Sequence, residues 1–317
     1  MYNKKLSDIF ICPVCKTSRL YINKETLLCK NSDCIKSLNP FHIVNSKPVL
    51  INFEESAIDE DTFKNNVGKS IVKRRSSYIT KVFRSLFTGQ SKRTINNFSD
   101  LKKKMFSISD PKILIIGGGE IGSGLEDFHT HLKKNIISFD IYNSDNVDFI
   151  SDAHNIPIRE NYFDLVIIQA VLEHVLEPNQ VVSEIYKVLK KDGIVYAETP
   201  FIQQVHEGPF DFTRYTESGH RFLFKNFKQV SSGYTSGVGT SLIWSLDFFC
   251  SGLFRSRYAG KISRIVFFWL RFFDNIIPDS FNIDGACGVY FIGQKSGYIM
   301  RGNEIIKYYQ GNQKLNK

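Results

Sequence analysis

The sequence has no uncharged apolar run of about 18 residues, which is the length that a transmembrane helix needs. Its first residues, MYNKKLSDIF, also lack the apolar core of a signal peptide. Cysteine is scarce beyond residue 34, where only the isolated Cys250 and Cys287 occur. A chain of 317 residues buries enough apolar surface to fold without disulfide bonds. We therefore expect a cytoplasmic protein in a reducing compartment, without a membrane span.

Acidic residues are nearly missing from residues 64–104, where Asp100 alone stands against twelve lysines and arginines. A basic excess favours nucleic acid or an anionic membrane as a partner. Here the excess is confined to one linker-like segment, which makes nucleic acid the weaker choice. Within it, residues 69–88 have apolar side chains at helical spacing and predict a basic amphipathic helix. The alternative is a solvated helix that packs on the main domain.

From Pro111 onward, short apolar runs alternate with helical segments. We predict strands and one amphipathic helix in this part of the chain. Continuous apolar strands that alternate with helices are typical of a parallel sheet covered on both faces. The pattern therefore predicts a doubly wound α/β domain. The predicted strands are residues 112–116, 136–140, 147–150, 164–169, 194–198 and 289–293, and the helix is residues 180–190.

A glycine-rich turn follows the first of these strands. Gly117, Gly119 and Gly122 permit a tight turn and a close approach of the backbone to a ligand. The helix after the turn offers free amide groups. Asp140, about 20 residues later, ends the second strand, where a carboxylate accepts hydrogen bonds from ribose hydroxyls. NAD and S-adenosylmethionine both satisfy this pattern, so the turn does not choose between them.

The next segment distinguishes the two cofactors. Asp152 follows the third strand, then come Pro157, the pair FD at residues 163–164 and LEH at residues 172–174. In this order the motifs resemble the class I S-adenosylmethionine-dependent methyltransferases, in particular the large type 11 group, over about residues 112–200. The resemblance implies a Rossmann-like, seven-stranded, mostly parallel sheet with S-adenosylmethionine as cofactor.

The resemblance also assigns residues to the cofactor. Asp152 would bind the adenine amino group, and Ala153 would pack beside the ring. The backbone from Gln169 to Val171 would line the methionine end. These residues join the three glycines and Asp140 as the expected cofactor site.

Ile115 departs from the family, which has an acid two residues before the first glycine, in contact with the methionine ammonium group. The nearby Glu120 is the candidate replacement. Glu173 and His174 are interpreted as structural or cofactor-lining residues, with direct catalysis as the alternative.

Four cysteines near the N-terminus have metal-ligand spacing, C-x2-C-x13-C-x4-C: Cys12, Cys15, Cys29 and Cys34. Two thiolate pairs that bracket a hairpin suit a tetrahedral zinc ion. Zinc would also stabilise a module of about 40 residues, which is too small to fold on its own core. Residues 39–50 resemble the zinc-ribbon module of the tRNA-methyltransferase activator family. We therefore expect a small β-rich module with a structural zinc ion.

Polar residues of several kinds gather after the fifth strand, at the edge where open α/β sheets bind ligands. We assign His206 as general base for an acceptor hydroxyl, Asp211 as the group that orients it, and Arg214 as the holder of an anionic group. In the alternative interpretation the three side chains hold one another and fix a lid. The pattern P-F-x4-H-x2-P-x-D-x2-R-x-T is similar to methyltransferases among bacterial surface-polysaccharide and glycan-modifying enzymes.

Residues 242–273 are unusually aromatic and apolar, although Arg264 and Arg271 interrupt them. We interpret them as core helices of an acceptor subdomain. The alternative is a surface that docks on a membrane, assisted by the basic helix at residues 69–88. A lipid-linked acceptor would make such docking useful.

Together these features predict O-methylation of a glycan or a related small acceptor, lipid-linked acceptors included. In that last case the protein would contact the inner face of the membrane. An RNA methyltransferase is the alternative, but ETPF at residues 198–201 stands in place of the N/D-P-P-[FYW] of enzymes that methylate base amino groups. A non-catalytic binding protein with the same fold is a further alternative, favoured by Ile115. An NAD-dependent oxidoreductase is disfavoured by Asp152 and the LEH segment.

The domain boundaries follow from the same patterns. We place a zinc-ribbon module at residues 1–53 and a linker with the basic helical segment at residues 54–110. The methyltransferase domain spans residues 111–300, with acceptor helices at 240–280, and a polar tail spans residues 301–317.

Overall fold

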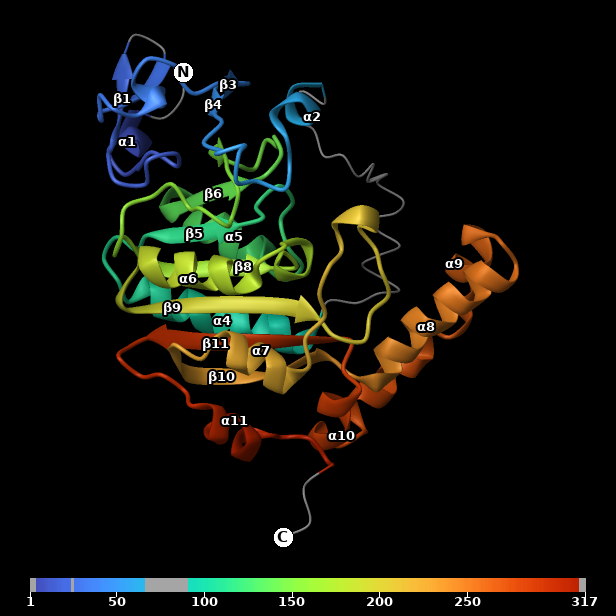
Figure 1. The fold of residues 1–317 in the computed structure, drawn as a ribbon. Helices are drawn as coiled ribbons and strands as arrows, with labels where there is room; N and C mark the ends of the chain where they lie inside the picture. The colour runs from blue at the N-terminus through green and yellow to red at the C-terminus, as the bar shows by residue number, and fades with distance from the viewer. Residues whose placement is uncertain (1–3, 24–25, 66–90, 314–317) are drawn as a thin grey trace.

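The computed structural model describes residues 4–23, 26–65 and 91–313. Its centre is a seven-stranded sheet in the order β10-β11-β9-β8-β5-β6-β7 (Figure 1). Neighbouring strands from β7 to β9 run parallel, whereas β11 runs antiparallel to both β9 and β10. This arrangement confirms the predicted doubly wound, mostly parallel sheet. The strands are β5 (Ile113–Ile116), β6 (Ile136–Asp140), β7 (Phe149–Ile150), β8 (Phe163–Gln169), β9 (Leu189–Pro200), β10 (Phe227–Ser236) and β11 (Gly288–Lys295).

Alternate residues of the central strands enter two separate cores, one on each face of the sheet. On one face, Leu114 and Val166 pack in the core that also holds Ile185 of α6 (Pro178–Val188). On the other face, Ile113 and Leu165 pack with residues of α4 (Lys92–Phe106) and α5 (Glu126–Leu132). Because β5 is buried on both faces, its sequence is a continuous apolar run.

The N-terminal module packs on the β7 edge of the sheet, at the top of Figure 1. Phe10 is fully buried, and its ring meets Phe149 edge-on at 5.1 Å. The Ile11 amide donates to the Pro157 carbonyl at 3.0 Å, and Val49 forms a parallel bridge with Ile150. The module and the sheet therefore share one core. The elements of the module are α1 (Lys4–Ser7), β1 (Leu20–Asn23), β2 (Thr26–Cys29), η1 (Ile35–Ser37), β3 (Ile43–Val44) and β4 (Lys47–Pro48).

The basic segment is described only at its two ends. The helix predicted at residues 69–88 lies outside the described residues. Before it comes α2 (Glu60–Asn65), and after it comes α4, which begins at a Ser91 cap and buries Phe98, Leu101 and Met105 against the sheet. Lys103 and Lys104 stay on the exposed side of α4.

The aromatic region forms an arm that extends away from the sheet (Figure 1). Its elements are α8 (Val238–Leu253), α9 (Arg257–Val266) and η5 (Phe268–Asn275). The expectation of core helices is wrong, because the residues that α9 buries are the small Gly260 and Ser263. A β-carbon on Gly260 would lie 2.0 Å from Asp247 Oδ1, so the two helices touch through small and polar residues. Many of the aromatic side chains, such as Phe249, Phe254 and Tyr258, are exposed.

The last segment is only partly a polar tail. After α7 (Glu217–Leu223) and α10 (Asp279–Asp284), residues 302–308 form α11 (Gly302–Tyr308). The Tyr308 hydroxyl donates to Glu217, and the Tyr309 hydroxyl donates to Asp284. These two tyrosines fasten the tail to the body of the protein.

Candidate functional site

The glycine-rich turn lies at the carboxyl end of β5, where its conformation requires glycine. Gly117 has a φ of +75°, and a β-carbon there would lie 2.2 Å from Val171 Cγ2. The Gly119 amide donates to Asp140 Oδ2 at 2.9 Å, and the Ile141 amide donates to Asp140 Oδ1 at 2.7 Å. The structure therefore brings together the turn and Asp140, two predicted parts of the cofactor site.

Gln169 connects this turn to the neighbouring strand β9. Its amide group donates to the Ser123 carbonyl at 3.1 Å and to Glu198 Oε2 at 2.6 Å. Its own Oε1 is buried without a hydrogen-bond partner among the described residues. A β-carbon on Gly122 would lie 1.9 Å from that oxygen, so a larger residue there would displace the Gln169 side chain.

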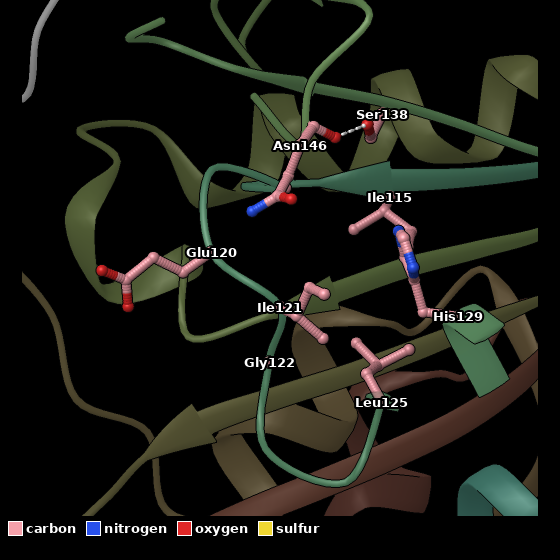
Figure 2. Close-up of a pocket in the computed structure, with 9 residues that line it drawn as sticks. Ile115, Glu120, Ile121, Gly122, Leu125, His129, Ser138 and Asn146 are labelled. Carbon is pink, nitrogen blue, oxygen red and sulfur yellow. Dashed lines mark hydrogen bonds between the residues drawn. The ribbon is translucent and has the colours of Figure 1, made fainter. Parts of the chain in front are cut away.

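Ile115 packs beside the turn, since a β-carbon on Gly118 would lie 3.6 Å from its Cγ2. It lines a cavity of about 10 Å³, together with Leu125 and His129, behind the turn (Figure 2). This volume accommodates about one water molecule, so the cavity is not a cofactor seat. Glu120 is exposed and points away from Ile115, so it does not take the place of the acid that the family carries.

Asp152 is buried and held by two side chains. His154 donates to Oδ1 from its backbone amide at 2.9 Å, and its ring Nδ1 lies 2.6 Å from the same oxygen. The Ser56 hydroxyl donates to Oδ2 at 2.6 Å. Burial opposes ionisation, but these hydrogen bonds lower the pKa of Asp152 below its usual range. Each carboxylate oxygen accepts about two hydrogen bonds, so Oδ2 keeps room for an adenine amino group beside the buried Ala153.

The contribution of Ser56 could not be read from the sequence, since it lies 96 residues before Asp152. His154 follows Asp152 by two residues in the same loop, so its contact with Asp152 could have been expected from the local sequence. The N-terminal segment thus supports a residue expected to contact the cofactor.

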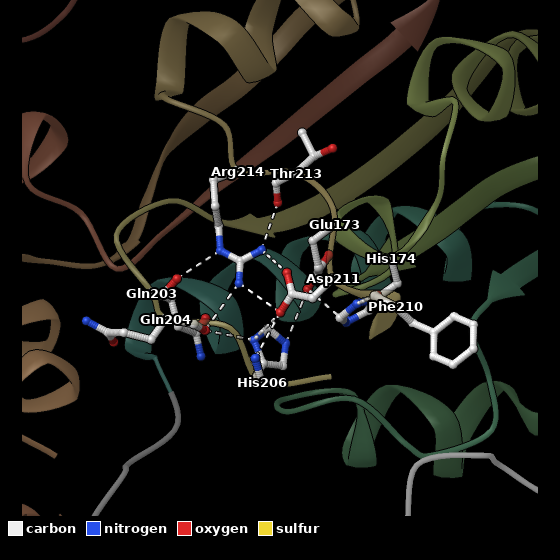
Figure 3. Close-up of polar contacts among 9 residues, drawn as sticks. All are labelled: Glu173, His174, Gln203, Gln204, His206, Phe210, Asp211, Thr213 and Arg214. Carbon is white, nitrogen blue, oxygen red and sulfur yellow. Dashed lines mark hydrogen bonds and ion pairs between the residues drawn. The ribbon is translucent and has the colours of Figure 1, made fainter. Parts of the chain in front are cut away.

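The predicted acceptor loop follows β9 and is fixed by Arg214. Its guanidinium donates five hydrogen bonds: to both oxygens of Asp211 and to the carbonyls of Gln203, Gln204 and Thr213 (Figure 3). A guanidinium has five N–H groups, so every donor is engaged within the loop. Burial opposes ionisation of Asp211, but Arg214 outweighs it and lowers the pKa of that carboxyl to about 2. The geometry therefore agrees with the alternative in which these side chains fix a lid.

His206 is held by the same loop and faces Glu173. Its amide donates to Asp211 Oδ2 at 2.9 Å, and its ring Nδ1 lies 3.4 Å from that oxygen. Its Nε2 lies 3.9 Å from Glu173 Oε1. Asp211 thus contacts His206, and the roles of Asp211 as orienting group and of His206 as general base stay predictions.

Glu173 and His174 belong to η3 (Leu172–His174), directly after β8. Glu173 is 1% exposed, and neither carboxylate oxygen has a hydrogen-bond partner among the described residues. Burial raises its pKa to about 8 and lowers the pKa of His174 below its usual value. The LEH motif drew attention to Glu173 and His174 in the sequence. Their proximity to His206 depends on the fold of a loop some thirty residues further along the chain.

The four N-terminal cysteines come together. Cys12 Sγ lies 3.9 Å from Cys34 Sγ, and Cys15 Sγ lies 3.6 Å from Cys29 Sγ. All four sulfur atoms lie within 4.8 Å of one another. In a tetrahedral zinc–thiolate site with Zn–S bonds of about 2.3 Å, sulfur atoms are about 3.8 Å apart. The donor set and its spacing therefore fit zinc.

Residues 120–197 match a family model described as a methyltransferase domain. The matched stretch begins in the turn and ends within β9, so it contains Gly122, Asp140, Asp152 and Gln169. Together with the strand order and the reversed β11, the match defines the class of the protein. The chain is an S-adenosylmethionine-dependent methyltransferase with the class I fold.

Several solved methyltransferase structures are similar in fold at low identity. A proposed sarcosine dimethylglycine methyltransferase from Galdieria sulphuraria is 14% identical, with a TM-score of 0.43, over 69% of this chain and 98% of its own. A methyltransferase from Archaeoglobus fulgidus is 16% identical, with a TM-score of 0.41, over 69% of this chain and 100% of its own. No curated protein matches the chain. Identities of this size carry no information about the acceptor.

Proposed function

We propose that the protein transfers the methyl group to a hydroxyl of a glycan or a related small acceptor. The observation that carries this proposal is a cavity of about 530 Å³ at the acceptor loop. Its lining surface is mostly apolar, with Val205, Phe212 and Phe248 as walls, and the polar side chains of Gln203, Gln204, Asp211 and Thr213 are set among them. Amide, carboxylate and hydroxyl groups beside an aromatic face suit the hydroxyls and the apolar ring face of a sugar.

The part of the site formed by the glycine-rich turn, Asp140, Asp152 and Gln169 is called the cofactor half, and it fits S-adenosylmethionine. The part formed by Glu173, His174 and the loop with His206, Asp211 and Arg214 is called the acceptor half. Asp140 would hold the ribose hydroxyls, Asp152 the adenine amino group, and Gly117, Gly119 and Gly122 would let the backbone approach closely. Ala153 would pack beside the adenine ring, and the buried, unpartnered Gln169 Oε1 would accept a hydrogen bond at the methionine end. When bound, the cofactor supplies an electrophilic methyl group on a sulfonium ion.

His206 is the residue that activates the acceptor hydroxyl in this proposal. Asp211 holds its backbone and ring, and Arg214 holds Asp211. The three residues predicted as catalytic thus have two roles in this proposal. His206 acts on the acceptor, whereas Asp211 and Arg214 position His206. Arg214 has no donor left for an anionic group within its described contacts.

The exposed apolar and basic side chains of the arm support contact with an anionic membrane surface. Such contact would suit a lipid-linked acceptor. Many of its exposed side chains are aromatic or aliphatic: Leu242, Phe249, Leu253, Phe254, Tyr258, Ile262, Trp269, Phe272 and Ile276. Arg255, Arg257 and Lys261 are exposed among them. The acids of the arm are engaged, because Asp247 pairs with Arg264 at 2.8 Å and Asp274 accepts from the Gly239 amide at 2.7 Å. No helix in the described ranges is long and apolar enough to cross a membrane.

Vesicle sedimentation tests this part of the proposal. We expect the protein to sediment with phosphatidylglycerol-containing vesicles and much less with phosphatidylcholine alone. Exchanging Trp269 and Phe272 for serine should abolish sedimentation, whereas the same exchange at the exposed Ile299, outside the arm, should not. Equal sedimentation of the arm variant and the unaltered protein would refute the membrane contact.

The four cysteines are proposed to hold a structural zinc ion. The chain should then contain one zinc ion, and Cys12→Ser should remove it and lower the melting temperature, because Cys12 is fully buried in the shared core. Cys250→Ser, on α8, is the matched control and should keep the metal. Elemental analysis without zinc in untagged protein would disprove the site.

The acceptor class is tested with radiolabelled S-adenosylmethionine. We expect label in free or polyprenyl-linked oligosaccharides and none in RNA. Transfer to RNA, with salt-dependent RNA retention, would replace the glycan proposal by the alternative that the basic segment at residues 64–104 favours. Binding of S-adenosylhomocysteine without transfer to any of these acceptors would favour the non-catalytic alternative.

A further inference from the structure

Two histidines from different parts of the chain converge on one buried carboxylate. Figure 3 shows Glu173 and His174 on η3, and His206 on the loop after β9. Glu173 Oε1 lies 3.6 Å from His174 Nε2 and 3.9 Å from His206 Nε2. These separations are too long for hydrogen bonds. The three ligand atoms nevertheless lie within 4.8 Å of one another.

This spacing suits an ion between the three atoms. Oxygen and nitrogen ligands bind a first-row divalent metal at about 2.0–2.2 Å, which places them about 3–3.5 Å apart. Small side-chain rotations would close the present gaps to that distance. Two imidazoles and one carboxylate are a ligand set that such metals use, with coordination positions left open.

The second ring nitrogen of each histidine is already held. His174 Nδ1 lies 2.7 Å from the Phe210 carbonyl. His206 Nδ1 lies 3.3 Å from the Gln204 carbonyl and 3.4 Å from Asp211 Oδ2. Metal-binding histidines commonly donate this second N–H to a carbonyl or a carboxylate, which leaves Nε2 free to bind. Both rings are therefore oriented with Nε2 toward Glu173.

Glu173 lacks a partner that would justify its burial. It is 1% exposed, and both carboxylate oxygens are without a hydrogen bond in the described ranges. Arg214 attracts it, but Asp211 and Glu207 repel it, and the five donors of Arg214 are all used within the loop. An unpaired carboxylate inside a protein is costly unless a cation or a donor meets it. A metal ion would supply that missing charge.

We propose that Glu173, His174 and His206 bind one divalent first-row metal ion, such as Mn²⁺, beside the acceptor cavity. Asp211 lies 3.4 Å from His206 Nδ1 and also lines that cavity, so the three ligands adjoin the cavity through Asp211 without lining it themselves. The inference rests on the proposed function and deepens it. In this arrangement His206 Nε2 would hold the ion instead of taking the proton directly. The ion would lower the pKa of an acceptor hydroxyl that coordinates it, and the proton would pass to solvent while the methyl group leaves the sulfonium ion.

Manganese titration tests the site. The untagged full-length chain is dialysed against chelator and titrated with Mn²⁺, and the free ion is followed by electron paramagnetic resonance. Mn²⁺ is chosen because it prefers oxygen and nitrogen ligands and avoids the four cysteines. We expect one bound Mn²⁺ per chain, with at least tenfold weaker binding in Glu173→Gln and in His206→Asn. His131→Asn, at an exposed histidine outside the cluster, is the matched control and should bind as the unaltered chain does.

Glu173→Gln is isosteric and removes a buried charge, so its melting temperature in chelator should equal or exceed that of the unaltered chain. Absence of Mn²⁺ binding up to millimolar concentration, or unchanged binding in Glu173→Gln, would overturn the site. Calorimetry with S-adenosylhomocysteine separates the two levels of inference. Cofactor binding and methyl transfer without Mn²⁺ binding would refute the ion alone, whereas Mn²⁺ binding without cofactor binding would refute the proposed function alone.

Discussion

The cofactor half and the acceptor half of the site differ in whether all their buried carboxylate oxygens have hydrogen-bond partners. In the cofactor half, Asp140 and Asp152 are buried, and each of their oxygens accepts a hydrogen bond from a neighbouring residue. In the acceptor half, Asp211 is satisfied by Arg214 and His206, but the two oxygens of the buried Glu173 have no hydrogen-bond partner among the described residues. Gln169 Oε1 is an exception on the cofactor side.

This difference indicates how the two ligands are bound. A satisfied carboxylate has a fixed position and needs only a small adjustment to receive a ligand. An unsatisfied buried group costs about 1–3 kcal/mol of folding stability, which a ligand recovers when it binds. We infer that the cofactor half is a preformed seat and that the acceptor half is completed by what it binds.

The largest effect is expected at His206. His206→Asn should lower the rate of methyl transfer about 100- to 10,000-fold, because the residue that activates the acceptor is lost. Affinity for S-adenosylhomocysteine should stay the same, since His206 belongs to the acceptor half. Transfer kinetics and calorimetry measure the two effects, with His131→Asn as control. A loss of cofactor affinity in His206→Asn would contradict the assignment of His206 to the acceptor half alone.

Asp140→Ala should weaken the binding of S-adenosylhomocysteine by at least about 100-fold. The variant loses two charge-assisted hydrogen bonds to the ribose, each worth about 1.5–3 kcal/mol, and also the acceptor of the Gly119 amide. Calorimetry measures the change. Asp145→Ala, at an exposed acid in the following loop, should bind normally. Unchanged affinity in Asp140→Ala would remove the ribose assignment.

His220 shows what an unpartnered group costs where no ligand is expected. It is 1% exposed on α7, and burial lowers its pKa to about 3. A histidine whose folded pKa is depressed stabilises the fold above its unfolded pKa of about 6.5, and this stability is lost as the pH falls below that value. Between pH 7 and pH 5 the unaltered chain should therefore lose about 2 kcal/mol that His220→Phe keeps. Urea unfolding at both pH values would show this, and parallel losses in the two proteins would contradict it.

The smallest effect is expected at Ser56, which links the N-terminal segment to the cofactor half. Ser56→Ala removes the hydrogen bond to Asp152 Oδ2 and should weaken S-adenosylhomocysteine about fivefold, or about 1 kcal/mol. Ser32→Ala, at an exposed serine of the N-terminal module, is the control. Equal affinities in the two variants would mean that Asp152 is positioned without the N-terminal segment.

Much of the sheet could be predicted because its strands are buried on both faces. The strands predicted at residues 112–116, 136–140 and 164–169 agree with β5, β6 and β8 to within one residue. In contrast, β10 was not predicted, because its sequence FKQVSSGYTS is largely polar and lies at the sheet edge. Edge strands with an exposed face do not produce a continuous apolar run.

The arm shows why apolar composition alone does not predict burial. Its helices were expected in a core because of their aromatic residues, yet Phe249 and Phe254 are more than half exposed. The contact between α8 and α9 uses Asp247 and Gly260 instead, which no hydropathy pattern distinguishes. Hydropathy reports which residues avoid water, but it does not report whether this chain alone covers them.

For the candidate site, the proximity of the cofactor residues could be expected from the sequence. The proximity of the acceptor residues could be expected only in part. The cofactor residues follow strand ends, and parallel strands bring such ends to one edge of the sheet. The approach of His206 to Glu173 depends on the fold of a loop fixed by Arg214, which sequence spacing does not reveal. The same holds for Ser56 and Asp152.

The central claim is that the turn and its carboxylates form a seat for S-adenosylmethionine. Calorimetric titration of the unaltered chain with S-adenosylhomocysteine, and separately with NAD, tests it most directly. We predict one S-adenosylhomocysteine bound per chain and no heat from NAD. Binding of NAD, or binding of neither molecule, would contradict the account.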